Sequence, residues 1–349
     1  MISAGFISGA AIGNVKPSSL DLTLSDEIYK VEGVFQPRPG ETVRQVLEKI
    51  KKETHSFDRP LMRNQMYIIR LNETLTLPSD VYGYCNPKSS SGRVDIHVRM
   101  IADGVSRYDT LNKGWKGELW VSVVPKSFPV KMSPGQSYNQ LRFFNEDTRL
   151  SNTELQIFMQ DSKLLWKLDG SNAYTFNDLT VHDNDGAIIQ QLDLSTDIVG
   201  YIGIQSDTVV DLGKIKHYDS ADFFKPIEKE GDFVYLKKDQ FYILSTHEAV
   251  RIPPELACEM VPMDERSGEF RSHYAGFIDP GWGWGKEGES NGRPLTLEVR
   301  PFEDIIVRHK QPIAKIRFER MAELPDVVYD SMDSNYLKQT GPKLGKNFK

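Results

Sequence analysis

The chain contains an internal repeat whose two copies stand 175 residues apart. The matched pairs are 65–69 with 240–244, 77–78 with 252–253, 140–143 with 315–318, and Gly117 with Gly292. Because 175 is nearly half of the 349 residues, the sequence predicts one ancestral domain duplicated head to tail. The expected boundaries are 1–150 for the first repeat, 151–194 for a connecting region, and 195–349 for the second repeat with a C-terminal tail.

Both copies are predicted to be mainly β. Apolar and polar residues alternate in runs such as Glu118–Val123 and Leu295–Val299, and this period of two, with β-branched and aromatic residues, is typical of strands. Prolines recur between such runs at turn-like intervals, which favours a small barrel or a jelly roll. Helices are expected only at 41–52, with Val43, Val46, Leu47 and Ile50 on one face, and in a short piece near 161–168.

Charge and cysteine content narrow the class of partner. A formal charge of -6 and a pI of about 5.7 argue against a nucleic-acid partner, although one small phosphate ligand remains compatible with them. Cys85 and Cys258 cannot form a disulfide framework, so a cytoplasmic location is expected. The absence of a basic leader and of a long apolar stretch predicts neither secretion nor a membrane partner.

Two basic loops occupy matched places in the repeats. Residues 88–93 read Lys-Ser-Ser-Ser-Gly-Arg, and residues 266–271 read Arg-Ser-Gly-Glu-Phe-Arg. Such segments offer a phosphate group charged donors, hydroxyl donors and, at a turn or helix start, free backbone N–H groups. Their repetition predicts an anionic ligand, while each loop taken alone could be a plain polar loop.

The second repeat carries a candidate acid/base. Glu298 lies within the apolar run 295–299, where a carboxylate is costly to bury unless it is paired or protonated. It is therefore a candidate general acid/base, and the alternative is that it points outward from a half-solvated strand. His97 and His273 are rival proton shuttles, although strand histidines are more often structural.

These segments resemble the dCTP deaminase branch of the dUTPase-like family, specifically its two-repeat members. The resemblance rests on the Ser-rich basic loop, on 275–282 (Ala-Gly-Phe-Ile-Asp-Pro-Gly-Trp), on Leu297–Val299 and on 17–22 (Pro-Ser-Ser-Leu-Asp-Leu). It implies tandem dUTPase-like β-barrels, jelly-roll-like, with few short helices. It also implies hydrolytic deamination of dCTP to dUTP and ammonia, with Mg²⁺ bound through the substrate triphosphate.

The resemblance also implies roles for particular residues. Glu298 would take a proton from the water that attacks C4 and pass protons to N3 and the departing ammonia, with Ser267 and Arg271 beside that water. Substrate-binding roles are implied for Ala275, Asp279, Arg266, Lys88, Ser89, Ser90, Arg93, Tyr336 and Gln339. The tail around 336–341 resembles a segment that folds over the triphosphate.

The first repeat lacks a matching acid, because Ser122 or Val123 stands opposite Glu298 depending on where a gap is placed. In this family a site is assembled between neighbouring domains, so 88–93 is expected to serve the half that contains Glu298, giving one kind of composite site per chain. Zinc nucleobase deaminases need a Cys-x-x-Cys pair, which two isolated cysteines cannot supply, so no catalytic zinc is expected.

Three alternatives to a simple dCTP deaminase remain open: a dUTP pyrophosphatase, a bifunctional dUMP-forming enzyme, and a nucleotide-binding β-protein that has lost turnover. The chain is expected to form a homo-oligomer, a trimer by analogy with single-repeat relatives. The same resemblance suggests dTTP as a feedback effector.

Overall fold

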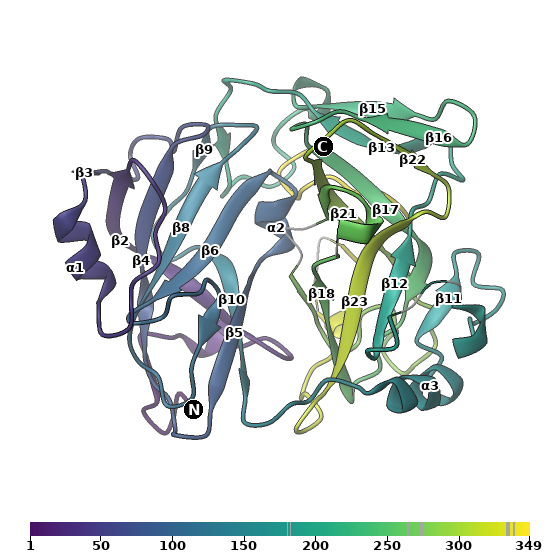
Figure 1. The fold of residues 1–349 in the computed structure, drawn as a ribbon, viewed down its shortest axis with the longest axis horizontal. Coiled ribbons are helices and arrows are strands. Elements are labelled where there is room, and N and C mark those ends of the chain that lie inside the picture. The colour runs from purple at the N-terminus through teal and green to yellow at the C-terminus, as the bar shows by residue number, and fades with distance from the viewer. Residues whose placement is uncertain (180, 182, 264, 273–275, 333–335, 338) are drawn as a thin grey trace. The chain divides into compact units, whose positions relative to one another are not determined.

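The computed structural model describes residues 1–349 except 180, 182, 264, 273–275, 333–335 and 338. The chain forms two compact units (Figure 1). Unit 1 comprises Met1–Asp147, Gln205–Asp219 and Gly345–Lys349, and unit 2 comprises Thr148–Ile204 and Ser220–Leu344. These units are defined by contacts within the structure, whereas the repeat boundaries 1–150, 151–194 and 195–349 stay a prediction from the sequence.

Unit 1 is built on a nine-stranded sheet with the order β6-β8-β4-β2-β10-β5-β7, which β1 and β3 extend. Its strands are β1 Ile7–Ser8, β2 Leu20–Val31, β3 Lys52–Thr54, β4 Met66–Thr76, β5 Tyr82–Pro87, β6 Ile96–Ala102, β7 Thr110–Leu111, β8 Lys116–Pro125, β9 Val130–Lys131, β10 Ser137–Phe144 and β14 Val210–Asp211. Its helices are α1 Val43–Lys49, α2 Ser89–Gly92 and the 3₁₀ turn Ile12–Asn14.

Unit 2 divides the same strand order over two sheets, β15-β13-β17-β21-β19 and β12-β23-β18-β20. Its strands are β11 Leu165–Lys167, β12 Ala187–Gln191, β13 Ile198–Gly203, β15 Phe224–Glu228, β16 Phe233–Leu236, β17 Tyr242–Val250, β18 Leu256–Val261, β19 Phe270–Ser272, β20 Phe277–Ile278, β21 Arg293–Pro301, β22 Ile305–Arg308 and β23 Pro312–Arg320. Its helices are α3 Asn152–Asp161 and the 3₁₀ turns Phe176–Asp178, Ser220–Asp222, Glu265–Ser267 and Tyr329–Ser331.

The pairing pattern confirms the predicted duplication. The neighbours β6-β8-β4-β2 of unit 1 correspond to β19-β21-β17-β13 of unit 2, and β2-β10-β5-β7 corresponds to β12-β23-β18-β20. The long strand β2 is thus replaced in unit 2 by two shorter strands. Ile68 faces Ser122 across β4 and β8, whereas Ile243 faces Glu298 across β17 and β21. The register therefore places Ser122, and not Val123, at the position of Glu298.

The helix expected at 41–52 forms as α1. Thr42 caps it, because its hydroxyl accepts from the Gln45 N–H and the Gln45 side chain accepts from the Thr42 N–H. The helix expected near 161–168 is wrong. A capping box at Ser151 and Glu154 starts α3 earlier, and Lys163 adopts a positive φ of 52°, so the chain continues as β11 at Leu165–Lys167.

Two segments far from 1–147 in sequence complete unit 1. β14 pairs in parallel with β9, and the backbone N–H of His217 donates to the carbonyl of Asn347 at 2.9 Å. The Asn347 amide also donates to the carbonyl of Lys214 at 2.7 Å. The last residues of the chain therefore belong to the same compact unit as the first 147, an arrangement that the repeat pattern alone does not predict.

Each unit contains a buried glutamate at the same repeat position. The Glu73 carboxylate accepts the Thr23 N–H at 2.9 Å, and the Glu248 carboxylate accepts the Gln191 N–H at 2.9 Å. Burial raises the pKa of both carboxyl groups, and the pKa of Glu248 rises to about 7. The duplication has thus kept a costly group in both copies, where each fixes the backbone of the neighbouring strand.

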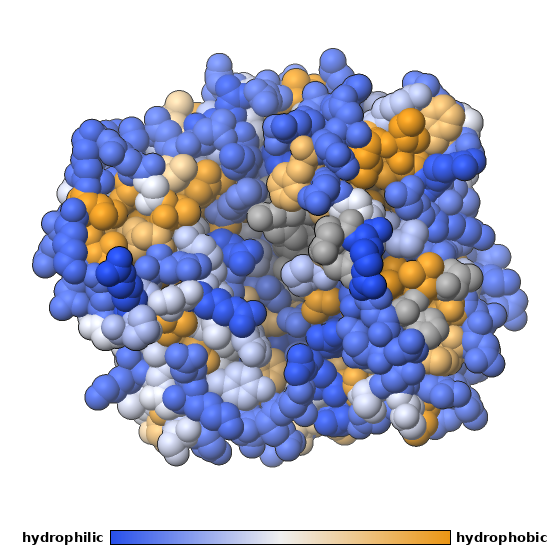
Figure 2. All heavy atoms as spheres, viewed as in Figure 1, coloured by the Kyte–Doolittle hydropathy of each residue, from blue (hydrophilic) through white to orange (hydrophobic). Residues whose placement is uncertain are grey.

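None of the described helices is long and apolar enough to cross a membrane. On the face drawn in Figure 2 hydrophilic residues predominate, and apolar residues form separate groups among them.

Candidate active site

Glu298 is buried on β21, with 3% of its surface exposed. Leu297 and Val299, on either side of it, belong to the hydrophobic core of unit 2. Because successive strand residues point to opposite faces, Glu298 lies on the other face together with Thr296, which is 7% exposed. That face is covered as well, so the alternative of an outward-pointing glutamate on a half-solvated strand is wrong.

The C-terminal tail lies along β21 close to Glu298. The Gln339 amide donates to the carbonyl of Pro294 at 2.7 Å, and the Thr296 hydroxyl donates to the carbonyl of Gly341 at 3.4 Å. The Lys343 N–H donates to the same hydroxyl at 3.3 Å. Tyr336 packs against the core of unit 2. Of the tail residues predicted to bind substrate, Gln339 is therefore held on the strand of Glu298.

An ion pair that the sequence analysis missed anchors the start of this tail. Arg293, the first residue of β21, binds Asp330 through two nitrogens at 3.0 and 3.1 Å. Asp330 also accepts the Gly285 N–H at 2.9 Å. Fixing one carboxylate against a strand and a turn holds the tail where it begins its path along β21. No local pattern pairs residues 293 and 330, so only folding reveals the contact.

The turn after β20 is tight. Gly281 has a φ of 88°, and a Cβ there would lie 2.5 Å from the Val328 Cβ. Asp279 is half-buried at the start of this turn, and its carbonyl accepts the Trp282 N–H at 3.2 Å. Trp282 is 7% exposed and packs in the core of unit 2. Ala275 lies outside the described residues.

Ser267 and Arg266 line a cavity of about 380 Å³ in unit 2, together with Val181, Asp183, Ile189, Met263, Gln311, Pro312 and Lys315. The Arg266 side chain is 77% exposed and reaches Asp183 at 3.7 Å. The side chain of Arg271, on β19, lies outside the described part of the structure. The cavity thus brings two of the predicted residues together with a cation, Lys315, that the sequence analysis did not single out.

Carboxylates already pair with Lys315 of this cavity and with Arg317, which lies on the same strand. Lys315 contacts Asp183 at 2.6 Å and Asp185 at 2.8 Å, and Arg317 contacts Asp185 at 2.6 Å. Burial acts to raise the pKa of Asp185, but the hydrogen bond and charge of Lys315 outweigh it, so that pKa lies below its ordinary value. A phosphate entering here would have to displace two ionised carboxylates.

The loop of the first repeat gathers its cations in unit 1. Lys88 precedes α2 and donates to Asp21 at 2.5 Å, while Arg93 at the end of α2 is 3% exposed. Burial and the nearby Lys88 charge hold the pKa of Lys346 below its ordinary value, against the opposing effect of Asp21. Ser89 and Ser90 are half-buried within α2. Here the buried Asp21 carboxylate is paired with Lys88, and its charge also acts on Lys346.

Fold and candidate site together define a class: a duplicated β-protein with a basic loop in each copy and a buried glutamate, Glu298, on β21 of the second copy. Two family models match nearly the whole chain. Residues 2–147 match the 2'-deoxycytidine 5'-triphosphate deaminase (DCD) N-terminal domain, and residues 162–348 match the DCD C-terminal domain. The chain belongs to the dCTP deaminase family.

Individual relatives agree with this assignment. The dCTP deaminase of Ignicoccus hospitalis is 27% identical over 81 residues, covering 23% of this chain and 41% of the relative. The dCTP deaminase of Sulfurisphaera tokodaii is 26% identical over 133 residues, covering 37% of this chain and 64% of the relative. The matches thus span less than two thirds of either relative.

A solved structure matches almost the full length. The crystal structure of 2'-deoxycytidine 5'-triphosphate deaminase from Agrobacterium tumefaciens is 32% identical to this chain, with a TM-score of 0.81. The match covers 93% of this chain and 95% of that chain. The likeness therefore includes both repeats and confirms the mainly β, duplicated fold.

Proposed function

We propose that this protein deaminates dCTP hydrolytically to dUTP and ammonia. The observation that carries the proposal is a glutamate 3% exposed on β21, on the same strand that the predicted tail contacts at Pro294 and Thr296. A carboxylate withheld from bulk water near a covering segment is suited to proton transfer in a closed site. Membership of the dCTP deaminase family supports the choice of substrate.

In the proposed reaction Glu298 accepts a proton from water as the water oxygen bonds to C4 of the cytosine. The protonated carboxyl then donates to N3. A second transfer through Glu298 moves the proton of the new C4 hydroxyl to the amino group, which leaves as ammonia when the C4–N bond breaks and C4=O forms. One water and one dCTP give one dUTP and one ammonia, and Glu298 returns to its starting state. Ser267 and Arg271 are proposed to lie beside the water, and Ala275 and Asp279 beside the pyrimidine and sugar.

The triphosphate is proposed to bind through Lys88, Ser89, Ser90 and Arg93. Their hydroxyl and cationic groups suit phosphate oxygens, whereas Mg²⁺ prefers oxygen ligands and water. The donor chemistry of this loop therefore fits a triphosphate that carries its own Mg²⁺. When bound, that ion neutralises phosphate charge, while the loop orients the nucleotide.

Deamination is proposed to need no zinc. Cys85 and Cys258 are both buried, and burial raises the pKa of the Cys85 thiol well above its ordinary value. A protonated, buried thiol is a poor metal ligand. Trimeric assembly, control by dTTP and a cytoplasmic location stay predictions.

Product analysis tests the proposed reaction. With dCTP and Mg²⁺, the purified protein is expected to release ammonia and dUTP in equal amounts and no pyrophosphate. Release of pyrophosphate would replace the proposal by the bifunctional or dUTP pyrophosphatase alternative. If the protein neither binds nor converts dCTP, the enzyme assignment is wrong, and the non-catalytic alternative takes its place.

Ligand stoichiometry tests which loop binds phosphate. One nonhydrolysable dCTP analogue is expected to bind per chain, because Asp183 and Asp185 already occupy Lys315 and Arg317. The double variant Asp183→Asn, Asp185→Asn frees those cations. Calorimetry should then detect binding of inorganic triphosphate at Lys315 and Arg317, with an affinity at least about tenfold higher than the unmodified protein has there.

The matched control for this experiment is the double variant Asp232→Asn, Asp304→Asn, which removes two exposed ion pairs, to Arg308 and to Lys237. It should leave triphosphate binding unchanged. Two equivalent analogue sites in the unmodified chain would defeat the proposal of a single kind of site.

A further inference from the structure

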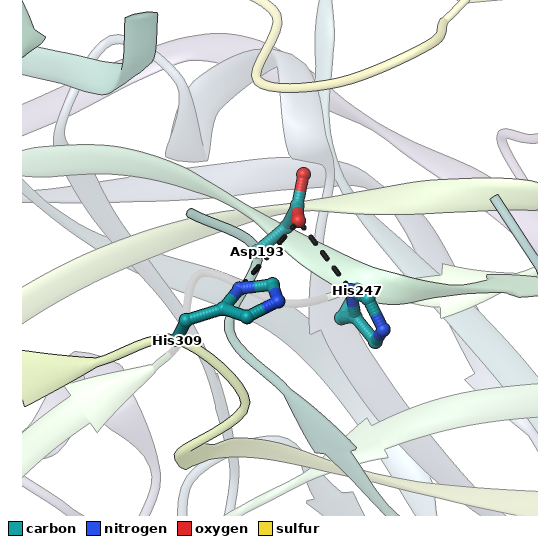
Figure 3. A group of neighbouring side chains, drawn as sticks. All are labelled: Asp193, His247 and His309. Carbon is teal, nitrogen blue, oxygen red and sulfur yellow. Dashed lines mark hydrogen bonds and ion pairs between the residues drawn. The ribbon is translucent and has the colours of Figure 1, made fainter. Parts of the chain in front are cut away.

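Three side chains of unit 2 converge at a place that the proposed reaction does not use. Asp193 follows β12, His247 lies on β17, and His309 lies in the turn between β22 and β23. Each offers a ligand atom, and these atoms all lie within 4.8 Å of one another. Figure 3 shows the Asp193 carboxylate facing a ring nitrogen of each histidine.

The distances approach those of a metal site. The Asp193 Oδ1 atom lies 3.4 Å from the His247 Nδ1 atom and 3.9 Å from the His309 Nδ1 atom. Ligand atoms about 2.0–2.1 Å from a tetrahedral Zn²⁺ are roughly 3.3 Å apart. The rings stand nearly perpendicular, at 88°, with centroids 4.9 Å apart. Small side-chain rotations would close the site, and His309, with 30% of its side chain exposed, has room for one.

The first repeat shows that the fold does not require these residues. Asn72 stands 175 positions before His247, and its amide donates to the carbonyl of Leu24 at 2.9 Å and to the Thr23 hydroxyl at 3.0 Å. The same junction is thus closed in unit 1 by ordinary neutral hydrogen bonds. The second repeat instead places an imidazole there, beside a carboxylate that is 6% exposed.

The hydrogen bonds of the cluster show that one ring nitrogen can act as a ligand. The Leu194 N–H donates to the His309 Nδ1 atom at 3.0 Å, so this nitrogen carries a lone pair, which an ion would take over.

Two lysines lie in the surroundings of the cluster. The Lys229 ammonium is directed at backbone carbonyls, those of Leu194 at 3.1 Å and Ser195 at 3.5 Å. Lys310 follows His309 in the sequence, and its N–H donates to the carbonyl of Leu192 at 2.9 Å. Their charges oppose a cation but do not occupy its ligands, so a strongly binding transition metal is favoured over a weakly held hard ion.

We propose that Asp193, His247 and His309 bind one divalent late first-row transition-metal ion, of which Zn²⁺ is the representative. Two imidazoles and one carboxylate are ligands that Zn²⁺, Co²⁺ and Ni²⁺ share, and the remaining coordination positions would hold water. The ion would tie together the end of β12, the interior of β17 and the end of β22. It has no part in the deamination proposed for Glu298.

Titration of the chelator-stripped full-length protein with Co²⁺ tests this site, because bound Co²⁺ absorbs visible light. The unmodified protein should bind one Co²⁺ per chain, and Zn²⁺ should displace it. Replacement of His247 by Asn, the residue that the first repeat carries at this position, should weaken Co²⁺ binding by at least about 100-fold. Mutation of a residue that only hydrogen-bonds to a metal ligand already costs about 10–100-fold in metal affinity, and loss of a ligand itself costs more.

Two further variants complete the experiment. His309→Gln should lose Co²⁺ binding in the same way, which keeps the test decisive if His247→Asn fails to fold. His217→Asn replaces an exposed histidine of unit 1 and should bind Co²⁺ as the unmodified protein does. Absence of Co²⁺ binding, or binding that survives both cluster variants, would overturn the proposal. Deamination with Mg²⁺ should be unchanged in His247→Asn, so this outcome is independent of the proposed activity.

Discussion

Replacement of Glu298 by Gln is expected to lower kcat for dCTP deamination by between about 10²- and 10⁴-fold, the usual contribution of a positioned general acid/base. The amide keeps the size and hydrogen-bonding capacity of the side chain but cannot accept the proton of the attacking water. Binding of a nonhydrolysable dCTP analogue should therefore change by less than about threefold, a small effect in free energy. Steady-state rates of ammonia release and calorimetry measure the two quantities.

Ser122→Ala is the matched control for Glu298→Gln. The β-sheet register puts Ser122 of the first repeat at the position of Glu298, and its hydroxyl donates only to the carbonyl of Arg99, at 3.4 Å, among its described contacts. Its loss should leave kcat within about twofold, as expected of a group outside the reaction. Comparable activity in Glu298→Gln would show that another group is the general base.

Glu248→Gln is expected to change the pH dependence of stability. The pKa of Glu248 is raised to about 7, above its ordinary value of 4.5, so the folded protein binds more protons than the unfolded chain between these values. The free energy of unfolding of the unmodified protein therefore falls as pH rises through this window, by about 3 kcal/mol in all. Glu248→Gln has no carboxyl group to ionise at this position, so its free energy of unfolding does not fall for this reason.

Urea denaturation at pH 4 and pH 8 measures the free energy of unfolding of both proteins. The difference, Glu248→Gln minus unmodified protein, should be about 3 kcal/mol larger at pH 8 than at pH 4. The comparison between pH values cancels the fixed cost of burying the new amide. Glu323→Gln, at an exposed position, should stay within about 0.5 kcal/mol at both pH values. An equal pH dependence in Glu248→Gln and the unmodified protein would contradict the account of a buried, reluctantly ionised carboxylate.

Much of the fold could be predicted because its signals are local. Alternating residues at 118–123 and 295–299 gave strands, and the capped apolar face at 41–52 gave a helix. The helix expected at 161–168 was misplaced, because the Ser151 capping box and the positive φ of Lys163 determine where α3 begins and ends. Glu298 could be singled out because a charged residue in an apolar run is visible in the sequence.

The ion pair of Arg293 with Asp330 and the carboxylates around Lys315 could not be predicted in the same way. Charged residues are common in this chain, and pairing depends on which loops meet after folding. The same holds for Asp193, His247 and His309, which three separate segments bring together. Their spacing in sequence follows no metal-binding motif.

By itself the sequence indicated a duplicated β-protein with a single candidate glutamate, because an internal repeat, strand periodicity and an acid within an apolar run can all be read from the order of the residues. The dCTP deaminase type followed from the resemblance of its motifs to that family. Only the tertiary structure decided that Glu298 is buried beside the tail, that 205–219 and 345–349 complete unit 1, and that carboxylates already pair with Lys315 and Arg317 on β23. Burial and charge pairing depend on long-range contacts, and these are set when the whole chain packs.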